Sequence, residues 1–507
     1  MADPYYITTA ISYPNGRPHI GHAYEAIAAD AIARYHRQAG RDVRFQTGTD
    51  EHGLKMVQTA RDRGVETRAL ADEMSGYFRE MDDRLNISYD RFIRTVEEDH
   101  HAASRAIWEA MAAAGDLYLD RYEGWYSVRD EAFYDEKELV DGEGGAKLSP
   151  QGTPVEWTAE ETWFFRLSKY QQPLLDHYAA HPEFIQPDAR RNEILRFVEG
   201  GLSDLSVSRT SFDWGVKVPG SDGHVMYVWV DALTNYLTGV GYPTSLGKYW
   251  PADLHLIGKD IVRFHAVYWP AFLMSAKIAL PKQVFGHGFL LNRGEKMSKS
   301  VGNVTDPIEL IDRFGVDPLR YFLLREVSFG QDGSYSEDAI VTRCNADLAN
   351  NLGNLAQRCL SIIAKNGAAV PEAGEATSAE EELVERVRAA EAEMRSAMSD
   401  LALHTALEAV WAASRDANVY FADQAPWSVR KTDPARADTI LYYAAEAVRR
   451  IAIMARWAIP ESADKLLDLL GQGGDVRNFD ALNRPIASGT PLPAPSGVFP
   501  RLEMEAA

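Results

Sequence analysis

The sequence predicts an α/β fold in which a parallel sheet is split by an inserted segment and followed by a bundle of helices. Short β-like runs alternate with longer helical patterns in about the first hundred residues, which is typical of strand–helix–strand units. Short aromatic runs and turns replace this rhythm from about Gly115 to Gly223, and the chain is helical after KMSKSVGNVTDP. Because 507 residues are too many for a single core, several domains are expected.

The individual elements follow from these patterns. YYITTA and DVRFQTGTD are predicted as strands, each followed by a helix. The insertion, with runs such as RYEGWYSVRDEAFYDEKEL, is predicted to form short strands and turns. HVMYVWVDALTNYLTG and DLHLIGKDIVRFHAVYWPAFLMSAKIAL are each predicted as a strand that leads into a helix, and the final helices are interrupted at KNGAAVPEAGEATSAE. The predicted segments are 1–115 and 225–290 for the two halves of the sheet domain, 116–224 for the insertion, 291–345 for a linking subdomain, and 346–507 for the helical domain and tail.

Composition narrows the class of protein. No run approaches the roughly 20 apolar residues that cross a bilayer, and the N-terminus lacks a signal-peptide pattern, so a cytoplasmic protein without a membrane partner is expected. Cys344 and Cys359 are too few for a disulfide framework and are predicted to be small buried apolar residues. The net charge of -21 argues only weakly against nucleic acid, because binding needs a local basic face. The pairs at 190–191 and 449–450 are candidate basic clusters or solvated helix faces.

A candidate phosphate site lies in SYPNGRPHIGH, where a tight loop leads from the first strand into a helix. The helix dipole and the N–H groups of the first turn are expected to face a ligand there. His19 and His22 are i, i+3 neighbours on one face, and Gly21 leaves room for a base or ribose to approach the backbone. The alternative is a capping turn with two exposed histidines.

The second candidate is the loop GEKMSKSVGN, where Lys296 and Lys299 can neutralise a departing pyrophosphate. Taken alone, such a loop is more often a solvated turn. The chain resembles the class I aminoacyl-tRNA synthetases, because the motif HIGH follows the first strand of a split nucleotide-binding sheet and the motif KMSKS comes just after its second half. The resemblance implies a Rossmann-like catalytic domain, ATP with Mg²⁺, an aminoacyl-adenylate intermediate and transfer to tRNA. It implies catalysis by His19, His22, Lys296 and Lys299, and ATP contacts at His19, Gly21, His22, Gly258, Asp260, Met297 and Lys299.

The amino-acid pocket is predicted beside this nucleotide site. The insertion is too small for the editing domain of the class I members for Leu, Ile and Val, and the first half of the chain lacks the cysteines of a zinc-thiolate site. Trp229 at a strand end, with residues of the following helices and of the first strand, is predicted to line an aromatic pocket with one histidine, which suits a thioether. Core packing is the alternative. The residues that form this predicted pocket are Ile11, Tyr13, Trp229, Ala232, Tyr236, Ile261 and His265.

Six runs together, among them AISYPNGRPHIGH, TGTDEHG, YVWVDALTNYL and DQAPW, resemble the methionyl-tRNA synthetase family over nearly the whole chain. The resemblance implies methionine contacts at the seven pocket residues and at Ala10 and Asp50, with the Asp50 carboxylate pairing with the substrate ammonium. A helix cap is the alternative for Asp50. The implied substrates are L-methionine, ATP and tRNA(Met), including initiator tRNA.

Two further expectations concern the insertion and the helical domain. Many relatives carry Cys-x-x-Cys knuckles in the insertion, but this segment has no cysteine, so no structural zinc or other metal site is expected. Leu233 stands where some relatives have proline, and only a local backbone difference is expected there. Asn354, Arg358 and Trp427 are predicted to stack on and read anticodon bases, with core packing or a surface ion pair as the alternative. A monomer is expected, because no appended nucleic-acid module follows.

The same residues are also compatible with two other functions. A metal hydrolase would use His19, His22 and a third ligand such as His52 or Asp50. A synthetase-like RNA-binding or regulatory protein would keep the fold without catalysis.

Overall fold

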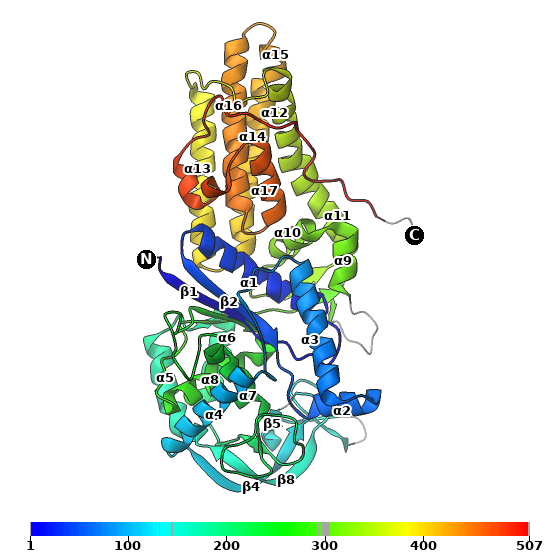
Figure 1. Cartoon of the computed structure of the whole chain (residues 1–507), viewed down its shortest axis with the longest axis vertical. Helices are drawn as coiled ribbons and strands as arrows, with labels where there is room; N and C mark the ends of the chain where they lie inside the picture. Colours follow the sequence, from blue (N-terminus) through cyan, green and yellow to red (C-terminus); the bar gives the residue numbers. More distant parts are fainter. Residues whose placement is uncertain (1, 131, 143–144, 293, 297–304, 505–507) are drawn as a thin grey trace.

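The computed structural model describes residues 2–130, 132–142, 145–292, 294–296 and 305–504. Figure 1 shows an elongated molecule with the α/β part at one end. At the other end a bundle is formed by the long helices α13 (Ser378–Ser399), α14 (Leu403–Gln424) and α16 (Pro434–Ala455). Within these ranges, no helix is both long and apolar enough to span a bilayer.

The central sheet joins segments that lie far apart in the sequence. Its six strands are parallel in the order β3 (Arg91–Arg94), β2 (Asp42–Thr49), β1 (Pro4–Thr9), β13 (Leu254–Gly258), β14 (Val284–His287) and β9 (Ile185–Gln186). The predicted parallel sheet built from two halves of the chain is therefore confirmed. From the pair β1 and β13, chain order runs outward through β2 and β3 on one side and to β14 on the other, with the earlier strand β9 added at that edge. In such sheets ligands bind beyond the carboxyl ends of the strands at the point where the order reverses.

One predicted strand is wrong. HVMYVW was predicted as a strand of the central sheet, but only β12 (Val225–Met226) is extended, and it pairs antiparallel with β11 (Ser208–Arg209) outside that sheet. Helix α7 (Val228–Thr238) begins two residues later, so Trp229 lies in its first turn and not at a strand end. The helix is buried almost all around, and a continuous apolar run does not distinguish a buried strand from a buried helix.

The inserted region forms antiparallel strands and also returns to the central sheet. β4 (Leu117–Ser127) pairs with β5 (Ala132–Tyr134) and β8 (Glu156–Phe165), and β8 pairs with β10 (Leu205–Ser206). The edge strand β9 comes from the same region and was not predicted, because two residues are too short for a sequence pattern. The other strands are β6 (Val140–Asp141), β7 (Lys147–Leu148), β15 (Leu290–Asn292), β16 (Glu295–Lys296) and β17 (Gly333–Tyr335).

Helices cover the sheet and then build the bundle. Helix α1 (Ile20–Gln38) follows β1, and α7 packs against α4 (Glu98–Ala113). A 3₁₀ turn at Lys259–Ile261 and a π-helical turn at Phe264–Tyr268 lead into α8 (Trp269–Ser275). A further π-helical segment spans Asn345–Gly353. The remaining helices are α2 (Leu54–Arg63), α3 (Thr67–Arg84), α5 (Gln171–Ala180), α6 (Asp188–Glu199), α9 (Pro307–Phe314), α10 (Val316–Glu326), α11 (Glu337–Cys344), α12 (Asn354–Lys365), α13 (Ser378–Ser399), α14 (Leu403–Gln424), α15 (Pro426–Val429), α16 (Pro434–Ala455) and α17 (Pro460–Leu469).

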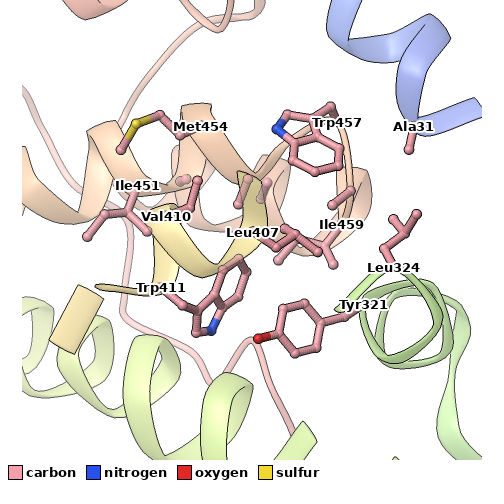
Figure 2. Packing of buried hydrophobic residues seen from close by; sticks show 14 of the residues in the cluster. Ala31, Tyr321, Leu324, Leu407, Val410, Trp411, Ile451, Met454, Trp457 and Ile459 are labelled. Atoms are coloured by element: carbon pink, nitrogen blue, oxygen red, sulfur yellow. The ribbon is translucent and has the colours of Figure 1, made fainter. Parts of the chain in front are cut away.

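The bundle and the sheet domain share a continuous hydrophobic core. Figure 2 shows Trp411 of α14 facing Tyr321 of α10, with ring centroids 4.5 Å apart, while Ala31 of α1 lies on the far side near Trp457. Both cysteines are buried as predicted, and burial raises the pKa of each thiol to about 12. Packing across α1 and α10 therefore holds the first helix of the sheet domain against the helical bundle.

Candidate active site

A cavity of about 460 Å³ opens at the carboxyl ends of β1 and β13, between α1 and α7. Residues predicted to bind the nucleotide and residues predicted to bind methionine both line this cavity. The predicted nucleotide residues on its wall are His19, Gly21, His22, Gly258 and Asp260. The predicted methionine residues on its wall are Ala10, Ile11, Tyr13, Asp50, Trp229, Ala232, Tyr236, Ile261 and His265.

The predicted loop lysines are only partly within the described structure. Lys296 ends β16, whose backbone pairs with β15. Met297 and Lys299 lie outside the described residues. Their roles stay predictions.

The two histidines cap α1 with their own side chains. At the N-cap, Nδ1 of His19 accepts a hydrogen bond from the N–H of Gly21 at 3.1 Å, and Nδ1 of His22 accepts from the N–H of His19 at 3.0 Å. The N–H of Ile20 donates to the carbonyl of Thr305 at 3.1 Å. The expectation that first-turn N–H groups face a ligand is thus wrong for residues 19–21, because these groups are already satisfied within the protein.

The caps fix the tautomers of both histidines. A ring nitrogen that accepts a hydrogen bond carries no proton, so the neutral form of each ring holds its proton on Nε2. The ring centroids of His19 and His22 lie 3.8 Å apart, and His22 also meets Phe78 edge-on at 5.0 Å. Both rings line the cavity, and an N–H donor of this kind suits an anionic ligand.

Gly21 is required by its neighbour. A Cβ at this position would lie 2.9 Å from the His19 ring. A larger residue would therefore push the N-cap imidazole out of place, a reason that the sequence did not show.

The opposite end of the cavity has an uncharged aromatic wall. Nδ1 of His265 contacts the carbonyl of Ile261 at 3.0 Å, and a carbonyl only accepts, so Nδ1 carries the proton. Nε2 then accepts from the Tyr236 hydroxyl at 2.6 Å. Burial lowers the pKa of His265 to about 4, and Trp229 stacks on Phe264 at a centroid distance of 3.8 Å. The Nδ1–H of His265 and the hydroxyl of Tyr236 therefore already donate to protein atoms. A ligand at this end of the cavity contacts polarisable, uncharged rings, an environment that suits a thioether.

Asp50 and Tyr13 line the same cavity. The N–H of Asp50 donates to the carbonyl of Ser12 at 2.9 Å, and its side chain is only 7% exposed. The alternative of a helix cap is wrong, since α2 begins at Leu54 with Gly53 at its N-cap. The hydroxyl of Tyr13 accepts a hydrogen bond from the N–H of Met56 at 3.1 Å, so this ring is held at the cavity wall.

A pair on the cavity wall, in which His287 is buried and Glu25 partly buried, was not predicted from the sequence. Glu25 of α1 contacts Nε2 of His287 at 2.8 Å, and both side chains line the cavity. Burial raises the pKa of Glu25. Burial also opposes the charge of His287, but Glu25 outweighs it and raises the pKa of the imidazole. The spacing of Glu25, three residues after His22, is the signal that could have predicted it.

Two of the predicted anticodon residues, Arg358 and Trp427, lie close together in the helical bundle, where Figure 1 labels α12 and α15 at the end away from the sheet. The Arg358 guanidinium of α12 lies 5.0 Å from the ring centre of Trp427 and 5.1 Å from that of Phe421. Trp427 is 44% exposed, so the alternative of a core ring is wrong. Asn354 is exposed and lies one turn before Arg358 on the same helix.

Across the described ranges, His, Cys, Asp and Glu side chains form no group of three or more that could hold a metal ion. His52, a ligand in the hydrolase alternative, instead contacts Asp231 at 2.5 Å.

Comparisons with known proteins point to one family. Residues 5–360 match the family described as tRNA synthetases class I (M), and residues 370–507 match the anticodon binding domain of methionyl tRNA ligase. The methionine--tRNA ligase of Brucella suis is 61% identical over 504 residues, covering 98% of each chain. That of Mycobacterium tuberculosis H37Rv is 59% identical over 512 residues, covering 99% of this chain and 98% of the relative.

Solved structures agree with this. The structure of Mycobacterium tuberculosis methionyl-tRNA synthetase in complex with methionyl-adenylate superposes with a TM-score of 0.97 at 59% identity, covering 98% of this chain and 100% of that one. Its apo form superposes with a TM-score of 0.90 at 55% identity, covering 99% of each. The family matches span nearly the whole chain and the relatives match it from end to end, so the chain belongs to the class I methionyl-tRNA synthetase family.

Proposed function

We propose that the chain activates L-methionine with ATP, forming methionyl-adenylate and pyrophosphate, and then transfers methionine to the 3′ end of tRNA(Met), including initiator tRNA. The observation that carries this proposal is the single cavity that joins the paired histidines of α1 to the wall formed by Tyr236 and His265. Family membership supports the same chemistry.

The first step is an in-line displacement. A carboxylate oxygen of methionine bonds to the α-phosphorus of ATP while the bond to the pyrophosphate oxygen breaks. The Nε2–H groups of His19 and His22 would donate to phosphate oxygens as charge develops, and Asp50 would pair with the substrate ammonium. In the second step a ribose hydroxyl of the terminal tRNA nucleotide attacks the carbonyl carbon, and AMP leaves. No nucleophile from the protein is needed.

Other assignments belong to this proposal. Gly258 and Asp260 would contact ATP, and a Cβ at position 258 would lie 2.7 Å from the Asp260 carboxylate. Mg²⁺ would enter with ATP, held mainly by phosphate oxygens and water, with Asp260 as a carboxylate of the kind it accepts; its chemistry would be to neutralise phosphate charge. Lys296, Met297 and Lys299 would act on the departing pyrophosphate.

The remaining proposals concern the whole molecule. We propose a cytoplasmic location, which the two unpaired, buried cysteines support. A monomer and the five-segment domain division stay predictions; sedimentation and limited proteolysis test them.

Charging of tRNA tests the proposed function. The purified chain should attach labelled methionine to both initiator and elongator tRNA(Met), and not to a tRNA with a different anticodon. A chain that binds tRNA(Met) but neither forms adenylate nor charges tRNA would instead be the regulatory RNA-binding protein of the alternative.

Trp427→Ala should separate charging from adenylate formation. If Trp427 stacks on an anticodon base, the change removes roughly 1–3 kcal/mol of stacking, so charging should fall by about 10-fold or more. Asn354→Ala and Arg358→Ala should behave alike. Pyrophosphate exchange and thermal melting should not change. Val419→Ala, which truncates another exposed apolar residue of the bundle, is the matched control; equal losses of charging in both variants would contradict the anticodon role.

Methionine recognition should be insensitive to pH near neutrality. His265 is held neutral by burial, with a pKa of about 4. Because this lies below the ordinary value, the folded protein protonates His265 only in acid, and the methionine KM should vary less than about twofold between about pH 6 and about pH 8. A KM that rises steeply below about pH 7 would show that the imidazole titrates there.

A further inference from the structure

Three consecutive residues after β2 send their buried side chains to different partners. Asp50 lines the cavity. Glu51, fully buried, accepts two hydrogen bonds of 2.7 Å from Arg94. His52, 3% exposed, contacts a carboxylate oxygen of Asp231 through Nδ1 at 2.5 Å. The contacts of Glu51 with Arg94 and of His52 with Asp231 therefore hold the segment that carries Asp50.

Asp231 in turn joins three elements. It lies on α7 between Trp229 and Ala232, which line the cavity, whereas Asp231 does not. One of its oxygens contacts His52, and the other contacts Nε2 of His100 on α4 at 2.6 Å. Nδ1 of His100 lies 3.0 Å from the Thr238 hydroxyl at the end of α7.

Asp231 is ionised despite its burial, so both of its oxygens can accept hydrogen bonds from the two histidines. Asp231 is 1% exposed, and burial opposes its ionisation. The two histidines outweigh burial and hold the pKa of this carboxyl below its usual range. At neutral pH Asp231 is thus a carboxylate that accepts one N–H at each oxygen.

We propose that Asp231 is a positioning residue for methionine: by holding His52 and His100, it fixes the Asp50 segment against α7. The inference rests on the proposed function, in which Asp50 receives the ammonium and α7 supplies Trp229 and Tyr236 to the side-chain pocket. The distance between the ammonium subsite and the side-chain pocket then depends on the contacts by which Asp231 holds α7 against residues 50–52. Weakening these contacts should leave the nucleotide end of the cavity unchanged, because that end is formed by α1.

Asp231→Asn is the first test. An amide offers one acceptor oxygen and places N–H groups where the second oxygen was, so it cannot accept from both histidines. The methionine KM in pyrophosphate exchange should rise by about 10-fold, with kcat and the ATP KM within about 3-fold, because the change disturbs substrate positioning at one end only.

Variants of His52 supply a rescue test. His52→Ala should raise the methionine KM as Asp231→Asn does. His52→Asn should largely restore it, because the asparagine amide can place an N–H donor near the position of Nδ1. In an Asp50→Asn background, Asp231→Asn should add little further loss, since coupled residues are not additive.

A matched control separates positioning from stability. Asp116 is another buried carboxylate, 1% exposed, which accepts from Lys169, Tyr170 and Ser275 away from the cavity. Asp116→Asn should lower the melting temperature without changing the methionine KM. The inference is overturned by an unchanged methionine KM in folded Asp231→Asn, by an equal rise in Asp116→Asn, or by fully additive effects with Asp50→Asn. Wild-type chain is assayed alongside; if it shows no methionine-dependent exchange, the proposed function itself fails.

Discussion

Arg320→Ala should lower the free energy of unfolding by about 3–5 kcal/mol, as expected when one partner of a buried ion pair is removed. Arg320 of α10 is fully buried and contacts Asp30 of α1, also fully buried, at 2.6 Å. Its guanidinium also donates to the carbonyls of Ala458, after α16, at 3.0 Å and of Leu85 at 3.2 Å. One side chain therefore links the helix that begins with the active-site histidines to the helical domain.

The loss of stability in Arg320→Ala should depend on pH, because the partner of Arg320 is the carboxyl group of Asp30. Burial alone would raise the pKa of Asp30, but Arg320 and Arg34 outweigh burial and lower it. A carboxyl with a lowered pKa stabilises the fold above its ordinary pKa, and this contribution is lost as the pH falls through the lowered value. The difference in stability between wild type and Arg320→Ala should thus be largest near neutral pH and smaller in acid.

Denaturant unfolding followed by tryptophan fluorescence measures the effect. Arg68→Ala is the control, because Arg68 and Asp72 form an exposed i, i+4 pair with side chains 56% and 47% exposed. Such pairs contribute roughly 0–1 kcal/mol. Equal unfolding curves for the two variants would show that the buried pair does not hold α1 against α10.

His22→Ala should reduce kcat for methionine-dependent pyrophosphate exchange by about 10²-fold or more, as expected for losing one donor that acts on the transition state. The ATP KM should change little. The reason lies in the geometry: Nδ1 of His22 is used by the N–H of His19, so the ring acts through Nε2 at the cavity wall.

Two conservative variants distinguish this role from capping. In His22→Asn the amide oxygen can still accept from the N–H of His19, but nothing replaces Nε2. In His22→Gln the amide reaches toward the position of Nε2. His22→Asn should therefore be stable and slow, and His22→Gln should be faster than His22→Asn. A His22→Asn enzyme with nearly wild-type kcat would show that the histidine only caps the helix.

The local part of this structure could be predicted from sequence. β1, β2 and β13, the start of α1 beside His19, and the i, i+4 relation of Ile261 and His265 follow from periodicity and from Pro and Gly positions. The cavity gathers every predicted methionine residue, because β1 and β13 end, and α7 begins, at one edge of the sheet.

The parts that depend on distant contacts could not be predicted. The edge strand β9 exists only because β14 lies beside it, and the short β12 pairs with β11 rather than with the central sheet. The partners of Asp231, which lie just after β2 and on α4, are more than a hundred residues away in sequence, and so is the partner of Glu25 at the end of β14. The spacing of His19 and His22 also does not show that each ring accepts a hydrogen bond from a backbone N–H group. Such pairings are set by the tertiary fold and leave no local pattern.

Amino-acid-dependent exchange of labelled pyrophosphate into ATP tests the central claim most directly, because it reports adenylate formation without tRNA. The purified chain should catalyse exchange with L-methionine, and exchange with leucine, isoleucine or cysteine should stay near background. Absence of exchange with methionine, or faster exchange with another amino acid, would contradict the assignment of the cavity to methionine activation.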